Sequence, residues 1–307
     1  MPCSPSCQLL IVLVGLLGLA SCDSLSTEVN PSQLQVETTK LVVTCFLSPQ
    51  DTVLAAKLTR TQPILSPTMG STVADNNVVD ATVTLSKGET SVGLVYDAKL
   101  GYYRISAQQL PILADETYTL RVQTPLGEVA TSSCRIPGPV PLLSVILDSL
   151  PNNQFGQSAK RFFVRAHWQD PAGPTNYYQL MGNAQYPYQD ENSKPRLGFT
   201  TLYFDNLVSS LQTDHGQEGG AMVSERDFFR YGSFAGATFG DLFQSVTVNL
   251  HLLNTDQGYY QYQRAVAQQA YNGDNPFAEP LPIPSNIQGA LGCFGGYNRS
   301  IISVRLR

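Results

Sequence analysis

The stretch Glu116-Thr117-Tyr118-Thr119-Leu120-Arg121-Val122-Gln123 decides the fold class of this chain. Its apolar residues alternate with polar ones, and a period of two is typical of a β-strand with one face in a core. A Pro-Leu-Gly turn signal follows at 125–127, and similar alternating segments lie upstream at 53–58 and 81–86. Short alternating segments separated by turn residues favour an antiparallel β-sandwich.

Residues 34–137 are therefore predicted to form one β-sandwich domain. The part from 81 to 128 resembles immunoglobulin-like and transthyretin-like modules, and this likeness of architecture implies no activity. Cys45 lies in an early apolar segment, and Cys134 lies in the last predicted strand of this domain. We expect the two residues to form a disulfide across the sandwich; the alternative is a pair of buried free thiols.

The second half of the chain differs in composition from the first. The stretch Pro137-Gly138-Pro139-Val140-Pro141 begins a Pro-rich linker, which is predicted over 138–150. Beyond it, residues 151–307 are predicted to form an aromatic-rich β domain, because 24 of the 29 aromatic residues lie after position 150. Any recognition by this protein is therefore expected in the second domain.

Two alternating segments and one helical segment define the predicted second domain. Segments 161–168 and 245–252 alternate strictly between apolar and polar residues and predict strands. Residues 256–271 are predicted to form a helix, with Thr255 or Asp256 as its cap. The expected fold class is mainly β, with this one helix in the C-terminal half.

The composition excludes several classes of protein. The chain has 307 residues, of which 14% are charged and 42% hydrophobic, so it is too apolar for a disordered protein. Its net charge of -5 argues against a nucleic-acid partner, because phosphates attract clustered Lys and Arg. The length is sufficient for two domains that each bury a core.

The N-terminal residues predict export and a lipid anchor. Residues 9–20 form an uncharged apolar run of signal-peptide length, and no second run of that length follows. The run ends in Leu19-Ala20-Ser21-Cys22, which resembles the lipobox of bacterial lipoproteins. This resemblance implies cleavage after residue 21, acylation of Cys22 and a tether over 22–33. The alternative is an ordinary secretory signal with an accidental Cys.

Five segments of the chain together resemble one known family. They are Trp168-Gln169-Asp170-Pro171-Ala172-Gly173, Asn176-Tyr177-Tyr178, Tyr259-Tyr260-Gln261-Tyr262, Asn275-Pro276-Phe277-Ala278-Glu279-Pro280 and the stretch from Ser285 to Tyr297. In order and spacing they resemble the outer-membrane lipoproteins of Bacteroidota known as domain of unknown function 4249. The resemblance implies a periplasmic or surface-facing lipoprotein, often found beside a TonB-dependent receptor, and supplies no catalytic residues.

The Pro- and Gly-rich segment from Asn275 to Tyr297 is predicted to be a long loop held in one conformation. Such loops often carry recognition. The candidate recognition residues are Asn275, Phe277, Glu279, Asn286, Phe294 and Tyr297. Cys293 lies within this segment and is expected to be a core residue.

Most of the candidate catalytic residues in the sequence are better explained as ordinary surface or loop residues. Gly232-Ser233-Phe234-Ala235-Gly236 has its Ser one position too early for a nucleophile elbow. His167 and His251 could meet in one sheet and bind a metal, but isolated surface histidines are far commoner. The remaining candidates are the loop residues Asp214, His215 and Glu218 and the acidic pair Glu225 and Asp227. We expect no catalytic residues, no metal and no cofactor.

Three functions compete on this evidence. The leading hypothesis is a lipid-anchored binding or accessory protein at the outer membrane that works with a TonB-dependent receptor in nutrient uptake. The second is a surface hydrolase of glycans or peptides, which would depend on Glu225, Asp227 or His215. The third is an envelope adhesin or structural protein.

Overall fold

The computed structural model describes residues 39–62, 76–151, 160–189, 192–202, 207–216, 218–229, 246–272 and 281–305. The chain divides into two compact units, Met1–Thr39 with Pro63–Ser66 and Lys40–Gln62 with Pro67–Arg307, and the structure below is that of the second unit. The predicted signal peptide, lipobox, Cys22 and tether lie outside the described residues. Within these residues, no helix is both long and apolar enough to cross a membrane.

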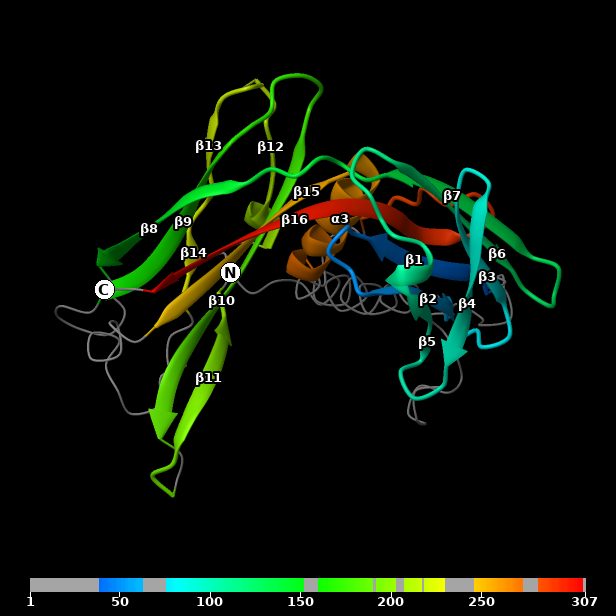
Figure 1. Ribbon diagram of the computed structural model, residues 1–307, viewed down its shortest axis with the longest axis horizontal. Helices are drawn as coiled ribbons and strands as arrows, with labels where there is room; N and C mark the ends of the chain where they lie inside the picture. Colours follow the sequence, from blue (N-terminus) through cyan, green and yellow to red (C-terminus); the bar gives the residue numbers. More distant parts are fainter. Residues whose placement is uncertain are drawn as a thin grey trace, which may run out of the picture. The chain divides into compact units, whose positions relative to one another are not determined.

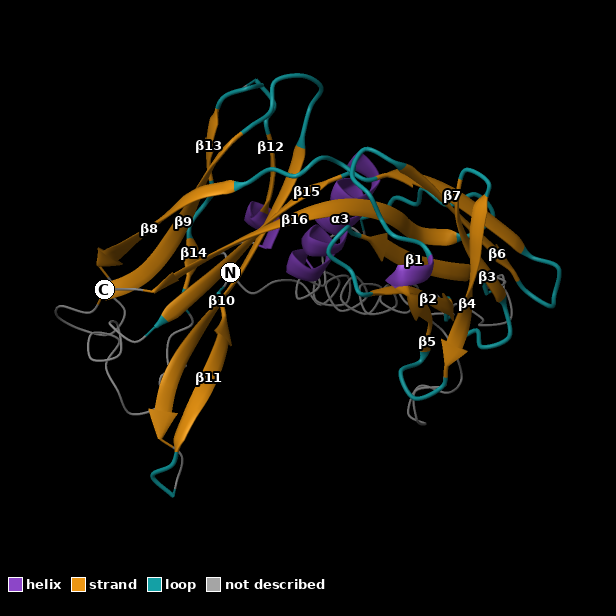
Figure 2. Cartoon of the chain, in the orientation of Figure 1, coloured by secondary structure: helices purple, strands orange, loops and turns teal. Residues whose placement is uncertain are grey.

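The fold is mainly β, as predicted (Figures 1 and 2). We call its first seven strands the first region. They are β1 (Leu41–Leu47), β2 (Val53–Arg60), β3 (Thr82–Lys87), β4 (Thr90–Asp97), β5 (Tyr102–Ser106), β6 (Thr117–Gln123) and β7 (Val129–Arg135). Their sheet order is β1-β2-β5-β4-β3-β6-β7, and every neighbouring pair is antiparallel.

The strands from β8 onward form the second region, with α3 packed beside them. They are β8 (Leu142–Pro151), β9 (Lys160–Gln169), β10 (Tyr177–Gln189), β11 (Pro195–Thr201), β12 (Leu211–Thr213), β13 (Ala221–Val223), β14 (Asp227–Phe228), β15 (Thr247–Thr255) and β16 (Leu291–Arg305), and the helix α3 spans Gln257–Asn272. The helix predicted near 256–271 is therefore confirmed. Most of the predicted linker is strand, because β8 begins at Leu142 and pairs with β9.

The long strand β16 belongs to both regions. Its first residues pair in parallel with β1, from Val42 opposite Leu291 to Leu47 opposite Gly296. Its remaining residues pair antiparallel with β15, beginning with Tyr297 opposite Thr255. Figure 1 shows β16 in red, beside β1 at one end and beside β15 along the rest. A single 12-stranded sheet consequently runs from the first region into the second.

Two separate cores lie beneath this sheet. The first core contains the alternating residues Tyr118, Leu120 and Val122 of β6, all at most 1% exposed. The hydroxyl of Tyr118 donates to the carbonyl of Pro111 at 2.9 Å and accepts from the amide of Leu113 at 2.8 Å. This phenol therefore ties the preceding loop to the core, as the tyrosine corner does in immunoglobulin-like sandwiches.

The second core lies between the four-stranded sheet of β8, β9, β13 and β14 and the C-terminal part of the large sheet. Its largest fully buried side chains are Trp168 and Tyr178, whose ring centroids lie 5.3 Å apart. They are joined by the inward residues of the alternating strands, among them Val164, Val248 and Leu250. Both cores thus follow the predicted strand periodicity.

The helix α3 covers the outer face of the sheet where the two regions join. Asp256 caps it: one carboxylate oxygen accepts from the amide of Tyr259 at 2.7 Å, and the other accepts from the amide of Gly296. The Tyr259 ring packs on Phe46 with centroids 4.9 Å apart and on Tyr297 with centroids 5.7 Å apart. The Tyr-rich motif of this helix is therefore part of a packed joint.

The predicted Cys45–Cys134 disulfide is wrong in this structure. Cys45, Cys134 and Cys293 are all buried free thiols, and burial raises the pKa of each. Cys45 on β1 and Cys134 on β7 both belong to the first core. Facing sheet layers lie about 10 Å apart, whereas a disulfide needs Cα atoms about 4.4–6.8 Å apart. Facing positions are therefore bridged only where the layers converge.

Candidate functional site

The residues predicted as a recognition loop divide between the joint and the undescribed part of the chain. Asn275, Phe277 and Glu279 lie outside the described residues. Asn286 accepts from the Phe294 amide at 2.9 Å and donates to the Phe294 carbonyl at 2.7 Å. Phe294 itself is completely buried in the first core, so its predicted role as a recognition contact is wrong.

Tyr297 is also held by contacts within the protein. Its hydroxyl bonds to the carboxylate of Asp51, and burial, followed by the negative charge of Asp51, raises the pKa of Tyr297. The preceding glycines allow close approach, since a Cβ on Gly295 would lie 2.8 Å from that of Tyr259. At Gly292, which has a φ of +112°, a Cβ would lie 2.0 Å from the carbonyl oxygen of Val43. The Gly-rich start of β16 therefore allows this strand to pack closely against β1 and α3.

The Trp168–Tyr178 motif closes one end of the second region. Tyr178 donates its hydroxyl to Asp170 at 2.5 Å, and Asp170 also accepts from the amide of Gly219 at 2.8 Å. Asp214 accepts from the amide of Asn176 at 2.9 Å. Burial, followed by the hydrogen bond to Asp170, raises the pKa of Tyr178, which remains a proton donor. The two buried carboxylates hold the loops 170–176 and 214–219 together.

The candidate catalytic groups do not converge in the described residues. His215 and Glu218 are exposed while their neighbour Asp214 is buried. Glu225 is exposed, whereas Asp227 is completely buried, and within the described residues neither of its carboxylate oxygens has a hydrogen-bond partner. Burial raises the pKa of Asp227 to about 8. The acidic pair therefore does not face a common cleft.

The two histidines weighed as metal ligands lie on different sheets. His167 is on β9 in the four-stranded sheet, and His251 is on β15 in the 12-stranded sheet. The expectation that they could meet in one sheet is therefore wrong. Across the described part of the chain, no group of three or more His, Cys, Asp or Glu residues could hold a metal ion.

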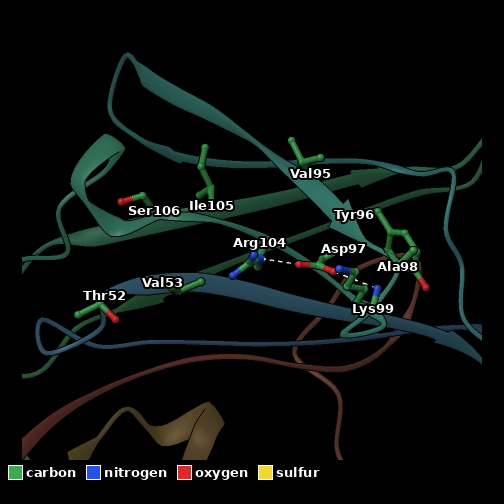
Figure 3. A pocket seen from close by; sticks show the side chains of 10 residues that line it. All are labelled: Thr52, Val53, Val95, Tyr96, Asp97, Ala98, Lys99, Arg104, Ile105 and Ser106. Carbon is green, nitrogen blue, oxygen red and sulfur yellow. Dashed lines mark hydrogen bonds and ion pairs between the residues drawn. The ribbon is translucent and has the colours of Figure 1, made fainter.

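A shallow groove of about 780 Å³ lies on the first region, between β2, β4 and β5 (Figure 3). The guanidinium of Arg104 forms an ion pair with Asp97 at 2.9 Å, and Asp97 also accepts from the amide of Lys99 at 3.0 Å. Val95, on the rim, is 70% exposed. Its charged lining side chains are Arg104, Lys99 and Asp97, so the Arg104–Asp97 pair leaves the formal charge of Lys99 in excess.

The outer face of the second region carries exposed apolar side chains among polar ones where α3 no longer covers it. On β10, Gln179 lies under the helix and accepts from the Tyr259 hydroxyl at 2.7 Å. Two residues further on, Met181 is 50% exposed. Met181 is opposite His251 on β15, which is opposite Ile301 on β16, and Ile301 is 53% exposed. Opposite residues share a face, so these side chains form one row.

A second apolar row lies on the same face, on the edge strand β11. Gln185 of β10 is opposite Phe199, and Pro187 is opposite Leu197. Since alternate residues of β10 point to one side, Phe199 and Leu197 lie on the same side as Met181. They are 64% and 55% exposed. We call Met181, Leu197, Phe199 and Ile301 the apolar face.

A polar ladder separates the two apolar rows. Asn249 of β15 donates to Asn183 of β10 at 3.0 Å and accepts from Ser303 of β16 at 2.7 Å. The strand pattern of β10 was the signal for this face, because its outward residues include both Met181 and Asn183. Sequence reasoning missed the face because a single exposed Met on one strand has no meaning until its neighbours across the sheet are known.

The architecture defines a mainly β protein with a sandwich-like arrangement of sheets and one helix in the C-terminal half of the described residues. The family model described as Domain of unknown function (DUF4249) matches residues 23–302, so the chain belongs to that family. This confirms the resemblance of the five motifs. No curated protein matches the chain.

Proposed function

We propose that this chain is a lipid-anchored binding or accessory protein of the cell envelope, acylated at Cys22 and held at the outer membrane. In this proposal it partners a TonB-dependent receptor in nutrient uptake. The lipobox at 19–22 and the preceding apolar run support the anchor. Several acyl chains, each contributing about 0.8 kcal/mol per buried CH2, would make the attachment lasting.

The apolar face is the observation that carries the binding role. Met181, Leu197, Phe199 and Ile301 are each at least half exposed and lie on one side of one sheet. Exposed apolar side chains that gather on one face mark protein interaction sites more often than isolated ones do. The polar ladder through Asn249 gives a partner hydrogen-bonding groups between the two rows.

Affinity purification tests the partner. The full chain, tagged and extracted in detergent from the membranes of the cells that make it, should retain a TonB-dependent receptor. Replacing Met181 and Phe199 by Glu should reduce the retained receptor at least about tenfold, because two charges would be buried at the contact. The matched control is Leu126→Glu, at a side chain that is 78% exposed in a turn of the first region. Repeated recovery of the chain alone would overturn the proposal.

Radiolabelled palmitate tests the anchor independently. The wild-type chain should incorporate the label and sediment with membranes, since the thiol of Cys22 is the acceptor in this proposal. The Cys22→Ser variant should lose both properties. Labelling that survives this substitution would contradict an anchor at Cys22.

A further inference from the structure

The strand β11 ends the large sheet, and β10 is its neighbour on the paired side. Just past β11, the amide of Leu202 donates to the carbonyl of Gly182 at 3.0 Å. In an antiparallel pair, hydrogen-bonded and non-hydrogen-bonded positions alternate. Counting back from Leu202, the backbone N–H and C=O groups of Thr201, Phe199 and Leu197 therefore point away from β10.

The same three residues place side chains on the exposed side of the sheet. Leu197 and Phe199 belong to the apolar face, and Thr201 is also exposed. Between them, Gly198 is covered on the core side by the Tyr186 ring, which would lie 2.6 Å from an added Cβ. Among the described strands, none pairs with the outer edge of β11, so this edge lies beside the exposed side chains of Leu197 and Phe199.

The usual protections of an edge strand are weak here. Natural sheets guard their edges with Pro, with charges or with a covering element. In β11 the only Pro is Pro195, at the first position, and the only charge is that of Arg196. The remaining residues, from Leu197 to Thr201, are uncharged and include two large apolar side chains. An open edge of this composition favours pairing with another strand.

We infer that the free edge of β11 receives an extended strand of a partner protein, whose alternate side chains are apolar and lie against Leu197 and Phe199. This inference rests on the proposed function, because it describes how a protein partner engages the apolar face. The backbone groups of Leu197, Phe199 and Thr201 supply the hydrogen bonds. Because Leu197 and Phe199 lie two positions apart, the partner strand should have apolar side chains at every second position. The partner's adjoining chain covers Met181 and Ile301.

A second copy of this chain fits the surface less well than a different protein does. A copy that added its own β11 in the plane of the sheet would cover the edge alone. Met181 and Ile301 would then stay exposed on both copies, because they lie on β10 and β16, away from the edge. One strand pairing also buries far less than the roughly 1,200–2,000 Å² of a stable interface.

Thr201 allows the backbone contribution to be tested by itself. The Thr201→Pro variant removes one outward N–H and places a ring on the edge, while Leu197 and Phe199 are retained. The loss of a single hydrogen bond should weaken partner binding about fivefold, and the ring should weaken it further. Thr201→Val is the matched control, since it keeps the N–H and favours a strand.

Site-specific photo-crosslinking identifies the occupant in intact cells. A photoreactive side chain at position 199 should crosslink to an extended segment of one partner, and mass spectrometry would locate that segment. The same group at position 95, on the first region, is the control and should not give this product. The crosslink at 199 should fall at least about fivefold in the Thr201→Pro variant and remain in Thr201→Val.

The outcomes separate this inference from the proposed function. If a receptor is retained but position 199 does not crosslink to it and Thr201→Pro binds normally, edge pairing is wrong and the accessory role survives. A crosslink at 199 to a second copy of the chain also overturns the inference. If no partner is retained by any form of the protein, the proposed function itself fails. Circular dichroism melting of both Thr201 variants checks that the fold is intact. If Thr201→Pro does not fold, the crosslink from position 199 in the chain that keeps Thr201 tests the edge pairing instead.

Discussion

The two regions share one sheet but differ in what they leave exposed. In the first region the most exposed large apolar residues, Leu126 and Val95, lie on separate hairpins. In the second region four such residues lie on one face of adjoining strands. The second region also buries three aspartates, Asp170, Asp214 and Asp227. Under the proposed function, the first region would serve as a scaffold, and the second would carry the features that cost stability.

Two phenylalanines give the sharpest test of this contrast. Phe294→Ala should lower the free energy of unfolding by about 3–5 kcal/mol, because it leaves a cavity in the first core. Phe199→Ala should change it by less than about 0.5 kcal/mol, since that ring is mostly in solvent, yet it should weaken partner retention. Urea unfolding of both variants measures the difference. Similar losses from the two substitutions would mean that Phe199 is a packing residue.

Asp227 should make stability depend on pH. Its pKa is raised to about 8 in the folded protein, whereas the unfolded value is about 3.9. The folded state therefore holds a proton that the unfolded state releases, so stability should be full below about pH 4 and fall as the pH rises towards about 8.

The Asp227→Asn variant is the control for this dependence. It should be the more stable protein at pH 8, by up to about 5 kcal/mol at roughly 1.4 kcal/mol per pKa unit, and should lose most of the slope. Thermal melting of both proteins between pH 4 and pH 9 measures it. A wild-type protein whose stability rises over this range would show that the carboxylate has found a partner.

The cap of α3 has an intermediate effect, because it acts on the joint between the regions. Asp256→Ala removes the acceptor for both Tyr259 and Gly296. It should cost about 1–2 kcal/mol, measured by urea unfolding. Asp256→Asn, which keeps one acceptor, should cost less. Equal losses from the two variants would indicate that the carboxylate charge matters more than its geometry.

The smallest effect should come from the groove on the first region. Arg104→Ala breaks the ion pair with Asp97, and the Arg104 side chain is 45% exposed. Surface pairs of this kind contribute about 0–1 kcal/mol, so stability and partner retention should both stay close to wild type. A strong loss of retention in this variant would move the recognition surface to the first region.

The individual strands and the helix could be predicted because the spacing of apolar and polar residues within each segment indicates its secondary structure. Tyr118, Leu120 and Val122 alternate, and the helical segment after Asp256 has a cap and is rich in Gln and Ala. The pairing of β1 with β16 could not be predicted, because nothing local in either strand specifies so distant a partner. The joint between them explains why Asn286 and Phe294 are structural where a loop pattern favoured recognition.

The apolar face was hidden for a related reason. Met181, Ile301 and Phe199 lie on three different strands, and only the register between strands places them on one face. The disulfide prediction was correct about burial and wrong about bonding. Both Cys45 and Cys134 are buried in the first core as expected, but both are free thiols, because burial in one core does not by itself give two cysteines the specific geometry of a disulfide.

The pairing of β16 with β1 has a consequence for how the chain is made. Gln50, just after β1, contacts Asn298 across 248 positions. While the chain is being synthesised, β1 has its neighbour β2 on one side only, and Phe294 is missing from the first core. The N-terminal half therefore stays incompletely folded until β16 has been synthesised, about 250 residues after β1, and such distant pairing favours slow folding.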